Sequence, residues 1–158
     1  MSTVRGLPRV EVVVEAASLE RTALGGVSGR IWLRDGDGET QADFPEVGWS
    51  DLPVALLAAW LPALERLARA VPSGGEAACH FMDGPYSFTV RAEAPAVWRV
   101  RCLESRAEGA AGAGPEWRTD AGTFLASVTR AARTVLAHCD ARGWWSDETE
   151  RLRRRLEK

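Results

Sequence analysis

Apolar residues along this chain of 158 residues recur with two different periods, and the change between them restricts the fold more than any other feature. Over residues 10–16 and 30–34 apolar and polar residues alternate, which is the pattern of a half-buried strand. The alternation returns after residue 76 in three segments that short turns with Gly or Pro separate: residues 77–81, 86–91 and 98–102. Strands joined by such short turns pair as antiparallel neighbours, so we expect an antiparallel sheet of about five strands.

A period of three to four residues replaces the alternation after Ser50 and predicts an amphipathic helix. The apolar residues at this spacing are Leu57, Leu61, Leu64, Ala68 and Val71. Ser50 or Asp51 is suited to cap the N-terminus of the helix. Pro62 lacks a backbone N–H and restricts the residue before it, so we expect a kink or a break between pieces near 52–60 and 62–71.

A second long helix is predicted to begin with Asp120 as its cap and to end at Gly143. Its apolar stripe consists of Phe124, Val128, Ala131, Val135 and Cys139. Beyond it, Asp147 and Glu150 have the spacing of a capping box. We expect a short C-terminal helix there, with Leu152 and Leu156 turned inward.

Together these segments predict one α+β domain spanning residues 1–158. In chain order it has two strands, a helix, three strands and a helix, followed by the short C-terminal helix. The antiparallel sheet packs against the two long helical segments. The Ala/Gly run over residues 108–115 resembles a linker.

The start of the chain has no charged segment followed by a long apolar one, and no window approaches the ~18 consecutive apolar residues of a membrane span. Cys79, Cys102 and Cys139 are an odd number at wide spacing, which is typical of reduced and buried thiols. We therefore expect a cytoplasmic protein with no membrane partner.

Motifs of the common enzyme classes, such as GxSxG, GxxxxGK[ST], GxGxxG and HExxH, are absent from the chain. The two histidines, His80 and His138, each stand beside a cysteine, and neighbours in a strand or helix point in different directions. Neither pair can form a dyad by itself, although Cys79 could meet His138 in space. We expect no catalytic residue, no metal and no cofactor.

An acidic segment over residues 35–51 contains no Lys or Arg. Five of its carboxylates fall on the positions of a calcium-binding loop: Asp35, Asp37, Glu39, Asp43 and Glu46. The loop lacks its required glycine, because Thr40 stands at that position, and Pro45 stands near its end. We therefore interpret the segment as a solvated acidic surface.

Trp32 shares a predicted strand face with Arg30 and Arg34, whereas Ile31 and Leu33 take the other face. An aromatic residue beside Arg is the usual composition of a protein-binding hot spot. A helix covering that face is the alternative explanation.

Nucleic acid is not expected as a partner, because the net charge is −2 and the C-terminal arginines are interspersed with glutamates. Lys occurs only at position 158 and Asn is absent, which indicates a GC-rich coding sequence. The abundance of Arg therefore does not indicate phosphate binding.

Three segments are similar to small bacterial immunity proteins of polymorphic-toxin and contact-dependent inhibition systems. They read FMDGPYSFTV at 81–90, VWRVRCLE at 97–104 and GTFLASVTRAARTVLAHC at 122–139. The resemblance implies a cytoplasmic inhibitor that blocks one cognate toxin by binding it.

Our first hypothesis is accordingly a protein-binding module that neutralises a cognate protein toxin of basic charge. Its expected contacts are Asp35, Asp37, Glu39, Asp43 and Glu46, with Trp32 as a candidate anchor. One alternative is a sensor of a small molecule or ion, with a pocket lined by Trp60 and Trp98 near Pro62. Another is a hydrolase that uses Cys79 or Cys102 as its nucleophile.

Overall fold

The computed structural model of the chain describes residues 6–36, 42–70, 74–105 and 111–157. Within these ranges the chain forms two four-stranded antiparallel sheets and three helices. The first sheet contains β1 (Val10–Arg21), β2 (Val27–Asp35), β3 (Asp43–Phe44) and β4 (Ser50–Asp51). The second contains β5 (Glu76–His80), β6 (Tyr86–Ala94), β7 (Val97–Ser105) and β8 (Ala111–Asp120). The helices are α1 (Pro53–Arg69), α2 (Ala121–Arg142) and α3 (Asp147–Leu156).

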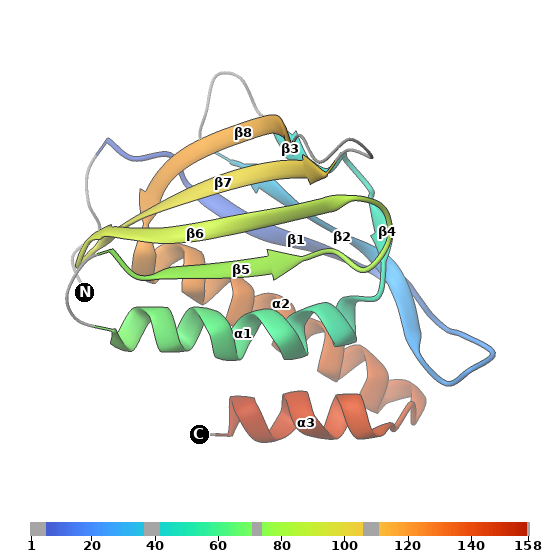
Figure 1. Cartoon of the computed structure of the whole chain (residues 1–158). Coiled ribbons are helices and arrows are strands. Elements are labelled where there is room, and N and C mark those ends of the chain that lie inside the picture. Colours follow the sequence, from blue (N-terminus) through green and yellow to red (C-terminus); the bar gives the residue numbers. More distant parts are fainter. Residues whose placement is uncertain (1–5, 37–41, 71–73, 106–110, 158) are drawn as a thin grey trace.

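The α+β class and the antiparallel pairing are as predicted. The prediction of a single sheet with about five strands is wrong, because the strands form two sheets. The five predicted strands are β1, β2, β5, β6 and β7, and they divide between two sheets. In the first sheet, β2 pairs with β1 on one side and with the short strands β3 and β4 on the other. The second sheet has the order β5-β6-β7-β8. In Figure 1 the second sheet lies in front of β1 and β2, and the helices run beneath and behind it.

Strand β8 was not predicted, because residues 111–115 have the Ala/Gly composition of a linker. They pair instead with the end of β7, at the edge of the second sheet. The pairing shifts register between Arg101 and Leu103, close to Pro115. An edge position and a bulge are where a sheet tolerates a residue without an N–H, so the tertiary pairing outweighs the poor strand propensity.

Of the kink or break predicted at Pro62, the break is wrong, because α1 runs as one helix from Pro53 to Arg69. Pro62 removes one backbone hydrogen bond, but apolar side chains on both sides of it, Leu61 and Leu64 among them, are fully buried. The predicted cap is also wrong, because Ser50 and Asp51 form β4 and the helix begins at Pro53 after Leu52. Proline is favoured at the first helical position, where its missing N–H would have no partner.

Helix α2 begins and ends as predicted. The Asp120 carboxylate accepts the Thr123 N–H at 2.8 Å, and Gly143 ends the helix in the left-handed conformation with φ of 68°. Helix α3 is capped one residue earlier than predicted, because the capping box joins Ser146 and Thr149.

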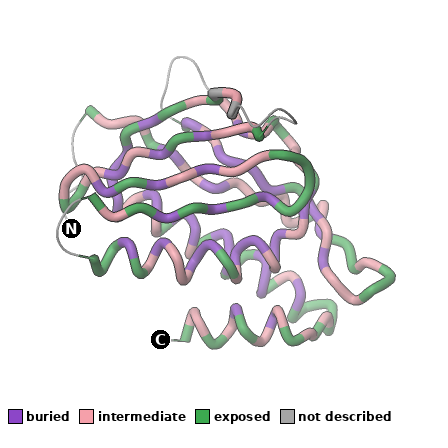
Figure 2. The backbone as a smooth tube through the Cα atoms, viewed as in Figure 1, coloured by how far each residue is buried: buried purple, intermediate pink, exposed green. Residues whose placement is uncertain are grey.

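A hydrophobic cluster lies between the two sheets and the three helices. Figure 2 shows buried stretches in both sheets and in the helices. The predicted inward faces of the strands and the α2 stripe all contribute to this cluster. The two sheets are joined where Val10 donates its N–H to Thr119 Oγ1 at 3.5 Å and the Thr119 hydroxyl donates to the Pro8 carbonyl at 3.0 Å. Among the described residues, no helix is both long and apolar enough to cross a membrane.

Candidate interaction surfaces

Trp32 lies on the predicted face of β2, opposite Val13 of β1, but its side chain is only 2% exposed. Its indole N–H donates to Asp43 Oδ1 at 2.9 Å, and the Arg34 guanidinium lies 5.5 Å from the ring centroid. Arg34 also pairs with Asp43 at 3.2 Å. The expectation of an exposed anchor at Trp32 is therefore wrong, because a satisfied and covered indole offers a partner almost no area.

The predicted acidic contacts divide into three groups. Asp35 is buried, and Asp43 is engaged by Trp32 and Arg34, so neither offers a free carboxylate to a partner. Glu46 is exposed. The predicted contacts Asp37 and Glu39 lie outside the described residues.

Asp51, predicted as a helix cap, is a buried carboxylate that joins two turns. Its Oδ1 accepts the backbone N–H of Leu52 at 2.7 Å and of Met82 at 3.3 Å. Its Oδ2 accepts the Trp49 indole N–H at 3.0 Å and the Asp83 backbone N–H at 3.1 Å. Four donors thus hold the turn before β4 against the turn between β5 and β6.

Among the exposed side chains of these two turns are four that we call the turn surface: Glu46, Val47, Met82 and Asp83. Val47 is 62% exposed and Met82 is 58% exposed, and with Leu24 and Trp145 they are the large apolar side chains that are exposed in the described part of the chain. The sequence contained the signal in the run FMDGPY, which places Met82 in a turn between two strands. The alternation rules assign no role to a turn residue, so Met82 was missed.

Beneath the turn surface, the Trp49 ring packs edge-on against the Tyr86 ring at a centroid distance of 5.0 Å. Gly84 closes the β5–β6 turn with φ of 71°, and a Cβ atom there would lie 3.1 Å from the Trp49 ring. The turn surface therefore rests on a fixed base of ring contacts and Asp51 hydrogen bonds.

A second surface is the outward side of β6, β7 and β8, where four arginines gather. We call it the arginine face: Arg91, Arg99, Arg101 and Arg118, with Glu93 and Glu116 among them and the exposed Glu76 of β5 opposite Arg91. Arg91 pairs in register with Arg99, and Arg99 with Arg118, so three arginines form one row across three strands. Like charges directly opposite each other destabilise a sheet unless carboxylates separate them.

Glutamates supply that separation for two of the arginines. The Glu93 carboxylate accepts a hydrogen bond from Arg99 Nε and lies 3.5 Å from Arg118 Nε, and Glu116 lies 3.4 Å from Arg99. The hydrogen bond from Arg99 holds the pKa of Glu93 below its usual value. Arg91 and Arg101 are both exposed, and neither has a carboxylate oxygen within 4 Å among the residues that the structure describes.

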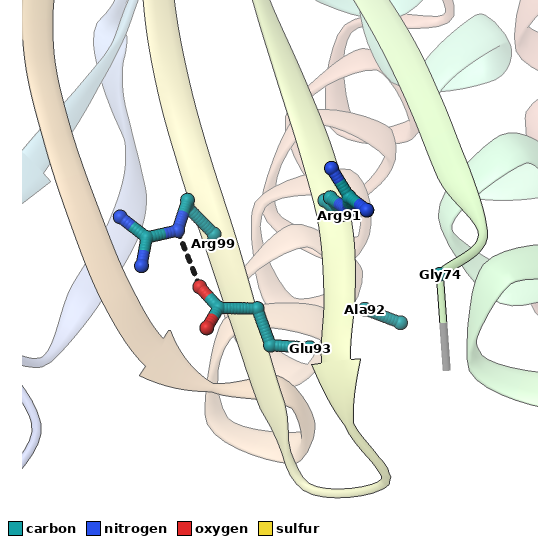
Figure 3. Close-up of a pocket in the computed structure, with 5 residues that line it drawn as sticks. All are labelled: Gly74, Arg91, Ala92, Glu93 and Arg99. Atoms are coloured by element: carbon teal, nitrogen blue, oxygen red, sulfur yellow. Dashed lines mark hydrogen bonds and ion pairs between the residues drawn. The ribbon is translucent and has the colours of Figure 1, made fainter. Parts of the chain in front are cut away.

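An open depression of about 490 Å³ lies at one end of the arginine face. Its lining residues are Gly74, Arg91, Ala92, Glu93 and Arg99 (Figure 3). Figure 3 shows the hydrogen bond from Arg99 to Glu93 on one side of this group and the Arg91 guanidinium on the other, directed away from Glu93.

All three thiols are buried, which opposes the cysteine-hydrolase alternative. Burial raises the pKa of Cys79 to about 12 and raises the pKa of Cys102 further. A buried thiol that stays protonated at neutral pH is neither accessible nor nucleophilic. His80, the neighbour of Cys79, is exposed on the opposite side of β5.

We predict that native protein reacts with iodoacetamide at least ~100-fold more slowly than protein unfolded in urea, because alkylation requires a local opening that exposes the thiolate. Mass spectrometry of timed samples measures the rate for each cysteine. Rapid native labelling of Cys79 or Cys102 would restore the hydrolase hypothesis.

The expectation of a sensor pocket lined by Trp60 and Trp98 is also wrong, because both side chains belong to the hydrophobic cluster. Trp60 packs edge-on against Phe81 and Phe88, and Trp98 against Phe124. Their rings are in contact with other rings where the pocket was expected. Within the described ranges, no group of three or more His, Cys, Asp or Glu side chains is arranged to hold a metal ion.

Comparisons with known proteins identify no family. No family model matches the chain, and no curated protein matches it. The chain is similar to crystal structures of MRP1/MRP2 from Trypanosoma brucei, with 16% identity over 87% of this chain and 88% of that chain. The TM-score of that similarity is 0.34, and we draw no conclusion from it.

Proposed function

We propose that this chain is a bacterial protein-binding module that neutralises a cognate protein toxin by direct contact through the turn surface, and that it acts in the cytoplasm. The observation that carries the proposal is the exposure of Val47 and Met82 on two turns that Asp51 ties together. The similarity of FMDGPYSFTV and its companion segments to immunity proteins supports the choice of a toxin as partner.

The apolar pair supplies the binding energy in this proposal. Burying one side chain of this size against a partner contributes roughly 1.5–3 kcal/mol. Because the turns are already ordered by Trp49, Asp51 and Gly84, little conformational entropy is lost on binding. Methionine also adapts to the shape of a partner more readily than a branched side chain.

The charges around the apolar pair favour a basic partner, because the arginine that lies beside Gly48, Arg30, is paired with Glu15 at 3.3 Å. Glu46 and Asp83 are exposed beside Val47 and Met82, and the surrounding segment 35–51 contains no Lys or Arg. Asp37 and Glu39 belong to the same segment and stay in the proposed contact set. Toxins that cleave nucleic acid are basic because they bind phosphate, so the turn surface complements their charge.

We expect the double change Val47→Asp and Met82→Asp to weaken binding to the toxin encoded beside this gene at least ~100-fold, because both apolar contacts are replaced by charges with no partner. Surface plasmon resonance with a catalytically inactive toxin measures the affinity. Growth of cells that co-express active toxin shows whether protection is lost.

Leu24→Asp is the matched control, because Leu24 is 99% exposed at the tip of the β1–β2 hairpin and lies outside the turn surface. This variant should bind and protect like the parent. The proposal fails if the parent does not bind the adjacent toxin at micromolar concentration, or if the double variant binds it equally well.

A further inference from the structure

The arginine face is a second surface with an unbalanced charge. The helices lie beneath and behind the second sheet, so they do not cover its outward side (Figure 1). Four arginines project there from the three adjacent strands β6, β7 and β8, against three glutamates on the same side: Glu76, Glu93 and Glu116. The ion pairs of Glu93 and Glu116 go to Arg99 and Arg118. Glu76 is opposite Arg91 and Glu116 is opposite Arg101, but neither forms an ion pair with the arginine that it faces. Arg91 and Arg101 are left with exposed guanidinium groups and no carboxylate within 4 Å in the described part of the chain.

The existing ion pairs show which chemistry this surface accepts. The carboxylate of Glu93 on β6 interacts with the guanidinium groups of both Arg99 and Arg118. Glu116 on β8 also pairs with Arg99. Arginine presents a planar set of donors that fits a carboxylate with two parallel hydrogen bonds. Further carboxylates would extend the same alternating arrangement to the arginines that lack one.

The positions of Arg91 and Arg101 fit an extended chain. Arg91 is opposite Arg99, and Thr89 is opposite Arg101, so Arg91 and Arg101 are diagonal neighbours on adjacent strands. Diagonal neighbours in a sheet are ~7–8 Å apart. Alternate side chains of an extended peptide lie on one side at a spacing of roughly 6.6–6.8 Å. Acidic residues at positions i and i+2 of such a peptide would reach both arginines together.

Single-stranded nucleic acid fits the same surface less well. Its binding sites combine basic side chains with aromatic rings on which bases stack. On the outward side of the described strands β5 to β8, the aromatic side chain is His80. It lies opposite Ser87, at the other end of β5 from the residue that faces Arg91. A single phosphate group is also disfavoured, because the two free arginines are separated and do not converge on one point.

We propose that the arginine face binds an extended acidic protein segment, with carboxylates at alternate positions pairing with Arg91 and Arg101. The open depression beside Arg91 and Glu93 provides room for one of these acidic side chains. This site is separate from the turn surface. Its partner is acidic, whereas the partner proposed for the turn surface is basic.

The test uses the full chain and two fluorescent probes, the peptide Ser-Glu-Ser-Glu-Ser-Glu-Ser and a twelve-residue oligothymidylate. Fluorescence anisotropy should show saturable binding of the peptide that weakens with added salt. The double change Arg91→Ala and Arg101→Ala should weaken peptide binding at least tenfold. The control Arg133→Ala and Arg154→Ala removes two exposed arginines from α2 and α3 and should change nothing.

The change Glu93→Gln tests whether the arginines of this face bind the peptide themselves or only maintain the structure of the sheet. It frees Arg99 and Arg118 from their shared carboxylate, so it should strengthen peptide binding several-fold, whereas loss of a structural ion pair would weaken it. The proposal is overturned if the oligonucleotide binds more tightly than the peptide, if Arg91→Ala and Arg101→Ala leave peptide binding unchanged, or if Glu93→Gln weakens it.

Discussion

Replacing Trp60 by alanine should lower the free energy of unfolding by about 4 kcal/mol, the largest loss that we expect from a single substitution in this chain. The side chain is 1% exposed and lies on α1 against the second sheet. Its ring packs at 5.1 Å from Phe81 and 5.0 Å from Phe88, and its indole N–H donates to the His80 carbonyl at 3.0 Å. Truncation would leave a cavity between the helix and β5, because the rings around it cannot close the space.

Urea denaturation followed by far-ultraviolet circular dichroism measures this loss. Trp60→Phe keeps most of the ring but not the indole N–H, so it should cost roughly 1–2 kcal/mol less than alanine does. Trp145→Ala is the matched control, because Trp145 is 61% exposed, and it should change stability by less than ~0.5 kcal/mol. Equal losses in Trp60→Ala and Trp145→Ala would contradict the packing described for α1.

Replacing Asp51 by alanine should cost about 3 kcal/mol, because four donors lose one acceptor. Three of these donors are backbone N–H groups of Leu52, Met82 and Asp83, and the fourth is the Trp49 indole. Water can replace only part of these bonds at a site where the carboxylate itself is buried. The loss should appear in urea denaturation as a lower midpoint with an unchanged slope.

The same substitution should also weaken partner binding, because it releases the two turns that present Val47 and Met82. Asp51→Asn retains one acceptor oxygen and should lose roughly half as much stability as alanine. Glu46→Ala is the control, since this exposed carboxylate should leave stability within ~0.5 kcal/mol of the parent. If Asp51→Ala were as stable as Glu46→Ala, Asp51 would not join the two turns.

The two proposed surfaces lie toward opposite ends of β6. Tyr86 packs beneath the turn surface at one end of β6, and Arg91 of the arginine face lies five residues further along the strand. At the rise of an extended strand, the two residues are roughly 17 Å apart. A basic partner on the first surface and an acidic segment on the second could therefore bind together. Losing one interaction should leave the other intact, so the variants distinguish the two proposals.

The sequence by itself determined the α+β class, five of the strands, the α2 helix with both of its ends, and the burial of the cysteines. These features follow from local alternation, helical spacing and capping residues, which act over a few neighbouring positions. It also located the acidic segment over residues 35–51.

Only the tertiary structure decided which of those residues meet. Residues 111–115 became a strand because β7 offered an edge, and α1 continued through Pro62 because its apolar side chains are buried on both sides. Trp32 lost its place as an anchor because its side chain is buried, its indole N–H donates to Asp43, and Arg34 lies over its ring. Asp51 gained its role from donors 31 and 32 residues away. Such contacts depend on the pairing of distant strands, which no local pattern encodes.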